Sequence, residues 1–175
     1  MNFLDHTMIW AKGEAFDMLL LALVGTLLFV IAGLLWKFAP TPVGQALPIP
    51  LSVVAMIFII AGMVGNWGNS SRLAQYESAY EQSAACFVHA EKARVSAFEA
   101  IYTYTIIGAA IAFAIAIVLF QLSENETIRA IAITLALIGL SGLVIDMFSK
   151  ERATTYEQAI DAEIARLNAL TNDTR

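Results

Sequence analysis

Cys86 and His89 are the residues of this chain whose types and spacing come nearest to a metal or thiol site. They lie three positions apart on a predicted helix, so their side chains can face the same way. A structural zinc site takes four ligands, and no second pair of such residues lies nearby in the sequence. No nucleophile–base set, phosphate-binding glycine loop or cleft with paired carboxylates is visible either. The sequence therefore predicts no catalytic residue, no metal, no cofactor and no enzyme.

Two acidic pairs, each with like charges four residues apart on a predicted helix, are better candidates for an interaction site. They are Glu77 with Glu81 and Glu157 with Asp161. Such a pair costs a helix about 0.2–0.5 kcal/mol unless a cation compensates it. The nearest predicted cations are Lys12 and Arg94, which lie at the ends of two membrane helices. Either these cations form internal salt bridges with the pairs, or a basic partner segment or a free cation binds between them.

The acidic pairs belong to a longer internal repeat. Residues 51–85 align without a gap to residues 131–165, with seven of the 35 positions identical. A second block, residues 11–17, aligns to residues 93–99. The matching polar pattern is Arg72, Tyr76, Glu77 and Ala79 against Arg152, Tyr156, Glu157 and Ala159. The repeat indicates a tandem duplication, and each Arg–Tyr pair is interpreted as a cation–π or packing pair on its own helix.

The composition indicates an all-α integral membrane protein. The chain has 175 residues, of which 59% are hydrophobic and only 14% charged, whereas soluble domains carry about 25% charged residues. Four stretches are apolar enough to cross a bilayer as helices: residues 18–36, 46–65, 100–122 and 129–146. No Asp, Glu, Lys, Arg or His lies within them, apart from Arg129 and Asp146 at the ends of the fourth. An ion-coupled transporter usually needs such a residue, so the sequence argues against one.

Basic residues predict the orientation of the four spans. If both termini lie on the same side as the 66–99 connection, eight of the ten Lys and Arg residues are on that side. The positive-inside rule then places both termini in the cytoplasm of a bacterial inner membrane. Thirteen of the fifteen acidic residues lie there too, so this face is acidic and would attract a basic partner segment rather than nucleic acid.

The predicted organisation is two helical hairpins in tandem, covering residues 1–86 and 87–170, with a disordered tail at 171–175. The first half has a lead-in that either lies along the interface or frays, then two spans and a cytoplasmic helix over 71–84. The second half has a return helix, two spans and a cytoplasmic helix over 149–170. The chain is expected to reverse near residues 84–88.

The cytoplasmic segments carry apolar stripes at spacings of three and four, which is typical of amphipathic helices. One stripe is Leu73, Tyr76, Tyr80, Ala84 and Phe87, and the other is Ala153, Tyr156, Ile160, Ile164 and Leu167. The stripes predict a small helical bundle below the membrane, although helices lying flat on the bilayer would show the same pattern.

Small residues predict close helix packing within the membrane. Gly108, Ala112 and Ala116 recur every four residues on the third span, while Gly62 and Gly142 align in the repeat. We expect these two glycines to meet near an axis relating the halves. Polar residues 102–105 enter the third span together and either bond neighbouring helices or line a vestibule.

Two short strings resemble an uncharacterised group of small bacterial four-span membrane proteins. They are Trp36-Lys37-Phe38-Ala39-Pro40-Thr41 and Phe148-Ser149-Lys150-Glu151-Arg152-Ala153. The resemblance implies the four-span layout and no activity. In size and span number the chain is also similar to bacterial membrane immunity proteins, by analogy only. The sequence favours a non-catalytic protein that binds itself or another membrane protein as an accessory, regulatory or toxin-immunity subunit; the alternative is a homo-oligomeric passive channel.

Overall fold

A computed structural model describes residues 2–173, apart from the side chains at positions 99, 100, 171 and 173. This part of the chain is helical, with no strand. Its helices are α1 (Phe3–Phe38), α2 (Pro42–Ala46), α3 (Pro48–Gln82), α4 (Ala84–Leu122) and α5 (Glu126–Asp173).

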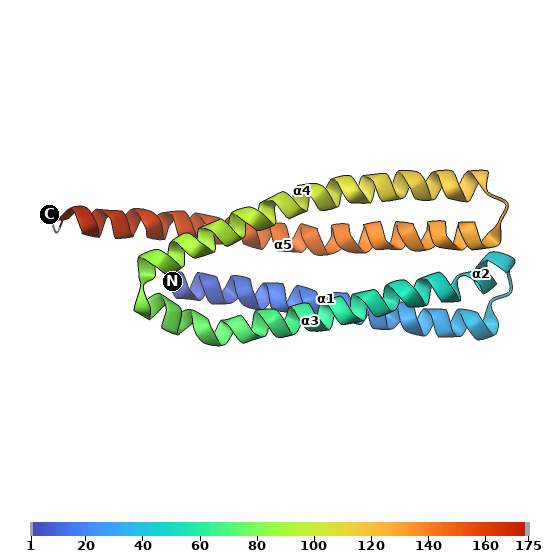
Figure 1. Ribbon diagram of the computed structural model, residues 1–175, viewed down its shortest axis with the longest axis horizontal. Coiled ribbons are helices and arrows are strands. Elements are labelled where there is room, and N and C mark those ends of the chain that lie inside the picture. Colours follow the sequence, from blue (N-terminus) through green and yellow to red (C-terminus); the bar gives the residue numbers. More distant parts are fainter. Residues whose placement is uncertain (1, 174–175) are drawn as a thin grey trace.

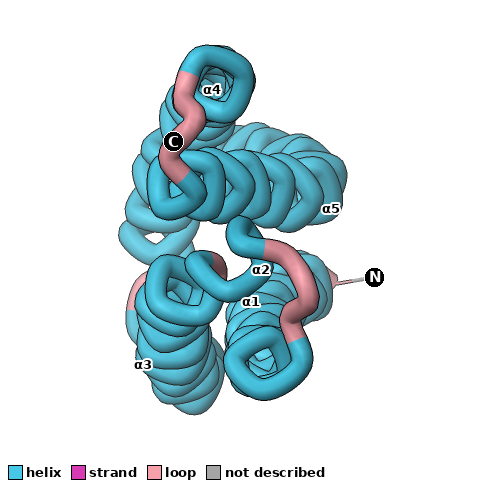
Figure 2. The backbone as a smooth tube through the Cα atoms, turned by 90° about the vertical axis from the view of Figure 1, so that its right-hand side faces the viewer, coloured by secondary structure: helices cyan, strands magenta, loops and turns pink. Residues whose placement is uncertain are grey.

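The four long helices form two antiparallel hairpins. Helix α1 packs along α3, and α4 packs along α5. Viewed end-on, one hairpin lies above the other, and short α2 lies between them at one end (Figure 2). The N-terminus, the turn between α3 and α4 and the C-terminal part of α5 lie at the opposite end (Figure 1). The last turns of α5 project beyond the other helices.

Local sequence explains where the helices begin and end. Helix α1 starts in a capping box, in which the Asn2 backbone N–H donates to the Asp5 carboxylate at 2.9 Å. It ends before Pro40, because a residue that precedes proline disfavours helical backbone. Pro48 and Pro50 fall in the first turn of α3, where a missing N–H is tolerated. The chain reverses at Ser83, whose extended backbone and hydroxyl cap α4.

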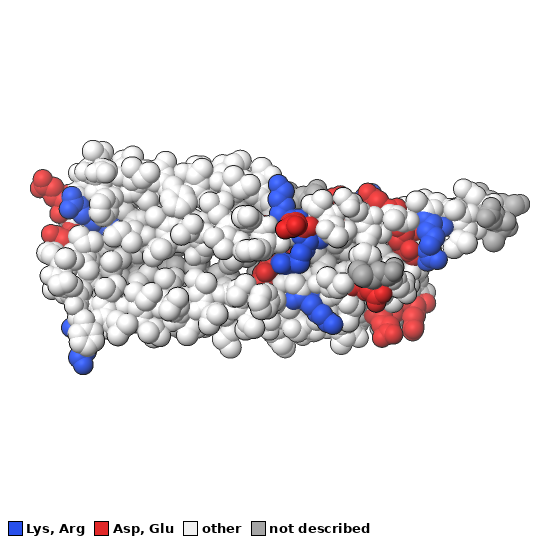
Figure 3. All heavy atoms as spheres, turned by 180° about the vertical axis from the view of Figure 1, so that it is seen from behind, with Lys and Arg blue, Asp and Glu red and all other residues white. Residues whose placement is uncertain are grey.

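All four long helices are long and apolar enough to cross a membrane. Large apolar side chains such as Leu23, Ile57, Ile117 and Leu140 are exposed along them. In Figure 3 charged residues gather over one half of the molecule and at the opposite tip, and a broad uncharged zone separates them. We call residues 3–17, 66–99 and 146–173 the charged half, and residues 18–65 and 100–145 the apolar half.

Each helix runs unbroken from one half into the other. Residues 71–82 of the segment expected as a separate helix over 71–84 are the end of α3, and the segment 149–170 lies within α5. No proline interrupts either boundary, and Gly68 stays helical with open space beside it. The lead-in is likewise part of α1, where Phe3 and Trp10 are buried. Helix α5 continues through the expected tail to Asp173, and positions 174 and 175 lie outside the described residues.

Glycines bring α1 and α3 into close contact. A Cβ on Gly62 would lie 2.5 Å from the backbone of Met18 and Ala22, and one on Gly25 would lie 2.7 Å from the Ala55 carbonyl oxygen. Only glycine permits this approach. The same close contact does not occur at Gly142, where a Cβ would meet the Thr105 methyl group at 3.4 Å.

The small-residue prediction needs correction in two respects. Gly62 contacts α1 and Gly142 contacts α4, so each lies within its own hairpin and they do not meet at an axis between the halves. A Cβ on Gly108 would meet nothing within 4 Å, so Gly108 has no packing role inside the described chain. Ala116 is buried and Ala112 is partly buried, as close packing of this helix requires.

The charged half has an aromatic core to which all four long helices contribute. Its members are Phe3, Trp10, Ala11, Tyr76, Phe87, Val88, Val95, Tyr156 and Ile160. Both apolar stripes supply side chains to it or pack against it, including Leu73, Tyr80, Ile164 and Leu167. The stripes therefore pack on one another, and the charged half is a four-helix bundle.

Candidate functional site

Five polar residues from three helices meet where the charged half joins the apolar half. We call Glu14, Asp17, Tyr102, Ser149 and Arg152 the boundary cluster. The Ser149 hydroxyl donates to Glu14 Oε1 at 2.6 Å, so the Tyr102 hydroxyl, 2.8 Å from Ser149 Oγ, is the donor in that pair. Arg152 forms a salt bridge with Asp17 and lies 4.0 Å from Glu14. The cluster thereby ties α1 to both α4 and α5.

The boundary cluster holds two carboxylates against a single guanidinium group. Glu14 and Asp17 are 6% and 3% exposed, and both precede the predicted first span. Burial raises the pKa of Glu14, while the Ser149 hydrogen bond opposes that rise. Burial also raises the pKa of Asp17, against the attraction of Arg152. Gly13 makes room for this arrangement, because a Cβ there would clash with the Arg152 side chain.

A second buried network surrounds Tyr156 in the aromatic core. The Tyr156 hydroxyl lies 2.9 Å from Glu91 Oε2 and 3.1 Å from Thr7 Oγ1. Burial and the Glu91 charge raise the pKa of Tyr156, which therefore stays a hydrogen-bond donor. Glu91 also pairs with Arg94.

Arg94 in turn covers two aromatic rings. Its guanidinium carbon lies 4.5 Å from the Trp10 ring centre and 5.5 Å from that of Tyr76. Trp10 stacks on Tyr156 with ring centres 5.0 Å apart. Cation–π contacts of desolvated groups stabilise more than exposed ones. This network joins all four long helices.

Two further polar links lie nearer the end of the charged half. The Tyr80 hydroxyl donates to Glu163 at 2.6 Å, and Arg166 bonds both oxygens of that carboxylate. Lys92 bonds Asp161 at 2.6 Å on the surface. These links tie α5 to α3 and α4.

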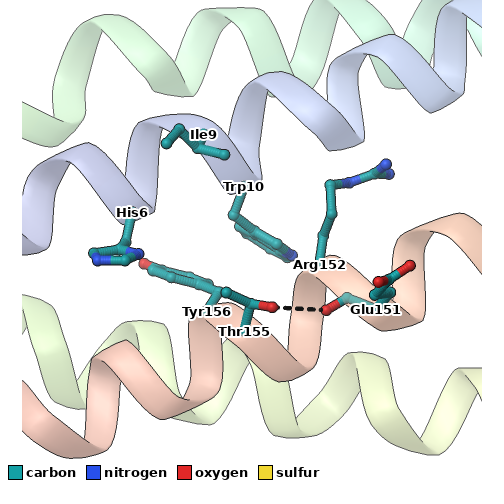
Figure 4. Close-up of a pocket in the computed structure, with 7 residues that line it drawn as sticks. All are labelled: His6, Ile9, Trp10, Glu151, Arg152, Thr155 and Tyr156. Atoms are coloured by element: carbon teal, nitrogen blue, oxygen red, sulfur yellow. Dashed lines mark hydrogen bonds between the residues drawn. The ribbon is translucent and has the colours of Figure 1, made fainter. Parts of the chain in front are cut away.

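A pocket of about 270 Å³ lies beside the boundary cluster, between α1 and α5. Its lining residues are His6, Ile9, Trp10, Glu151, Arg152, Thr155 and Tyr156. In Figure 4 the Trp10 and Tyr156 rings point toward one another from their two helices, and the Thr155 hydroxyl bonds the Glu151 backbone oxygen. Most of its lining is apolar, and it holds no arrangement of a nucleophile and a base.

The predicted interaction residues have different surroundings. Glu77 and Glu81 are exposed on α3, and neither forms an ion pair within the described residues. Asp161 bonds Lys92, which the sequence did not suggest as its partner, and Glu157 lies beside the same lysine charge. Lys12 is exposed.

Among the repeated arginines and tyrosines, Arg152, Tyr76 and Tyr156 have partners on other helices, whereas Arg94 pairs within α4. Arg94 binds Glu91, and Arg152 binds Asp17. Tyr76 lies under Arg94, and Tyr156 stacks on Trp10. Arg72 is exposed. The contacts of Tyr76, Arg152 and Tyr156 are thus mainly between helices, while the Arg72 charge also acts on Tyr76 within α3.

Sequence reasoning missed the buried acids Glu14, Asp17 and Glu91. A signal for the first two exists, because Thr7, Trp10, Glu14 and Asp17 follow each other at spacings of three and four on α1. Acidic residues on the same face as a buried tryptophan require partners from other helices. Their identity is not visible locally, since Arg152 lies 135 residues from Asp17.

Cys86 and His89 are both exposed near the start of α4. Across the described residues, no group of three or more His, Cys, Asp or Glu side chains comes together in a way that could hold a metal ion.

Comparison with protein-family models, curated proteins and solved structures found no match to this chain. What the fold and the site define is an all-helical protein with four helices long and apolar enough to span a membrane. The buried polar residues of its charged half bond one another across helices.

Proposed function

We propose that this chain is a non-catalytic protein of the bacterial inner membrane that binds another protein through its charged half. Such a protein would act as an accessory, regulatory or toxin-immunity subunit. The proposal places both termini and the charged half in the cytoplasm, with the apolar half in the bilayer. Support comes from the resemblance of two of its sequence strings, and of its expected layout, to small four-span bacterial membrane proteins.

The observation that carries the proposal is the open acidic pair on α3. Glu77 and Glu81 are exposed and form no ion pair in the described structure, whereas Asp161, the aligned counterpart of Glu81 on α5, bonds Lys92. The acidic pair on α5 therefore has a cationic partner within the chain, whereas the aligned acidic pair on α3 has none in the described structure. Like charges one turn apart repel, so a basic segment of a partner would relieve that repulsion. Its attraction would weaken with added salt.

The test is charge reversal on the open pair. The Glu77→Lys/Glu81→Lys variant and the wild type are purified from the native host in lipid nanodiscs, and co-purifying proteins are quantified at low and high salt. We expect one partner to bind the wild type in a salt-sensitive manner and to be recovered about tenfold less with the variant, because several close charge pairs are lost. The matched control is Glu124→Lys/Glu126→Lys, which changes two exposed acids at the opposite tip. Equal recovery with both double variants would contradict the proposal.

A passive homo-oligomeric channel is the second candidate, and exposure on α4 supports it. Tyr104 is 73% exposed, Thr103 is exposed beside it, and Gly108 one turn further has open space next to it. Several copies meeting along this face would bring polar groups together at the entrance of the span. Ion flux into liposomes that contain the protein distinguishes the candidates. Flux that Tyr104→Leu abolishes would favour the channel, and flux no greater than in empty liposomes would favour the binder.

A further inference from the structure

A groove of about 550 Å³ lies between α4 and α5, where the charged half meets the apolar half. Apolar side chains line one part of it, namely Ile106, Leu143 and Met147, and polar ones line the rest, namely Tyr102, Asp146, Lys150, Glu151 and Thr154. Ile106 and Leu143 belong to the apolar half, whereas Lys150, Glu151 and Thr154 belong to the charged half. This gradient follows the change from acyl chains to headgroups across a bilayer surface.

Asp146 is the unusual residue of this groove. It is partly buried: Oδ2 is inaccessible and has no hydrogen-bond partner within the described chain, so Oδ1 is the oxygen that a ligand in the groove can reach. The other buried polar atoms without a partner are donors: Trp10 Nε1, Arg94 Nε and Arg152 Nε. Thr105 approaches the Asp146 carboxyl group, but no described Lys, Arg or His lies within ion-pair distance. A partly buried carboxylate without a cation is costly, so its surroundings suit a cationic ligand.

Lys150 supplies the complementary charge. It is exposed, has no ion pair in the described structure and lies four residues after Asp146 on α5. The two positions are therefore about 6 Å apart along the helix axis. A ligand with an ammonium group and a phosphate joined by a two-carbon linker matches this order of an acidic and a basic side chain. The apolar walls suit the acyl chains of the same molecule.

We propose that the α4–α5 groove binds a phospholipid whose headgroup carries a primary ammonium group. Asp146 accepts hydrogen bonds from the ammonium group, Lys150 binds the phosphate, and Ile106, Leu143 and Met147 contact the acyl chains. A quaternary ammonium headgroup has no N–H to donate, so it binds less well. This site is separate from the acidic pair on α3, and either proposal can fail without the other.

Native mass spectrometry of the full chain tests the site. The protein is exchanged into equal amounts of phosphatidylethanolamine, phosphatidylcholine and phosphatidylglycerol with identical acyl chains, and the retained lipid is counted. We expect the wild type to retain phosphatidylethanolamine about tenfold over phosphatidylcholine, since a charged hydrogen bond is lost with the latter. Asp146→Asn should abolish this preference, and Lys150→Gln should reduce retention of all three lipids. Lys12→Gln, an exposed lysine outside the groove, is the matched control.

Three outcomes would overturn the proposal. They are equal retention of phosphatidylethanolamine and phosphatidylcholine by the wild type, an unchanged preference in Asp146→Asn, and a dimer of the chain that carries no lipid. Should Asp146→Asn fail to fold, Leu143→Trp fills the apolar part of the groove and must reduce retention of all three lipids. Unchanged retention in that variant would equally contradict the site.

Discussion

At the scale of single residues, Arg152 has the largest electrostatic role in the fold. Its guanidinium group faces two buried carboxylates, and it is the described cation nearest to Asp17. Removing one member of a buried ion pair leaves the other desolvated and uncompensated, which costs more than the pair itself stabilises.

We therefore predict that Arg152→Met lowers the free energy of unfolding by about 3 kcal/mol. Thermal unfolding in nanodiscs measures the loss. Adding Asp17→Asn to this variant should restore part of it, because the uncompensated charge is then gone. Arg72→Met is the control, since Arg72 aligns with Arg152 in the sequence but is exposed. A loss of similar size in that control would contradict the role given to Arg152.

Gly62 provides the second residue-scale prediction. A Cβ at this position would overlap the backbone of α1, and backbone cannot move aside as a flexible side chain can. Gly62→Ala should therefore lower the stability of the α1–α3 hairpin by about 1–3 kcal/mol, as overpacking does. Gly108→Ala should leave stability unchanged or raise it, because it meets no atom within 4 Å and alanine favours helix. Equal melting temperatures for the two variants would argue against close packing at Gly62.

At the scale of elements, hydrogen bonds and salt bridges between polar side chains hold the charged ends of α3, α4 and α5 together. Glu163 of α5 accepts hydrogen bonds from Tyr80 of α3 and from Arg166. The Arg166 hydrogen bond, assisted by the one from Tyr80, holds the pKa of Glu163 below its ordinary value. The ionised carboxylate thus binds its partners better in the folded state than in the unfolded chain.

The sign of the pH dependence follows from this lowered pKa. Stability from Glu163 is fully present above its ordinary pKa of 4.5 and is lost as the pH falls through the lower folded value. Glu163→Gln should therefore be less stable than the wild type by about 1 kcal/mol at pH 7, a small figure because Arg166 is more than half exposed. The difference should shrink below pH 4.5. Measuring the unfolding of both proteins across pH 3–7 checks this pH dependence, and Glu151→Gln, which changes an exposed acid, is the control. A stability difference between Glu163→Gln and the wild type that persists at low pH would contradict the role of the ionised carboxylate.

How far the sequence predicts these elements depends on the range of the contacts involved. Long uncharged runs predict the spans, and the spacing of Tyr76 and Tyr156 predicts a buried face on each helix. Local pattern does not show that Trp10 stacks on Tyr156 or that Arg152 pairs with Asp17, because those partners are more than a hundred residues apart. The continuity of α3 through Gly65 and Gly68 is also not visible in the sequence, since glycine has a low helix propensity.

At the scale of the whole molecule, successive long helices run in opposite directions, so the turns that connect them lie at two opposite ends. The N-terminus, the Ser83 turn and the end of α5 share the charged end, while α2 and the turn before Glu126 share the other (Figure 1). If the apolar half spans a membrane, these two ends must face opposite sides of it. Seven Lys and Arg residues lie in the charged half and two in the apolar half, so the positive-inside rule favours our proposal that the charged half faces the cytoplasm.

Labelling of cysteines tests this orientation directly, because the chain has a single cysteine. Cys86 is exposed at the charged end, so we predict that a membrane-impermeant maleimide modifies it in intact spheroplasts only after the membrane is permeabilised. In a Cys86→Ser background, Thr127→Cys places an exposed thiol at the opposite tip, and it should react without permeabilisation. The reverse pattern would place the charged half outside and remove the acidic α3 pair from any cytoplasmic partner. Reaction of both thiols in intact spheroplasts would show that the two ends do not face opposite sides.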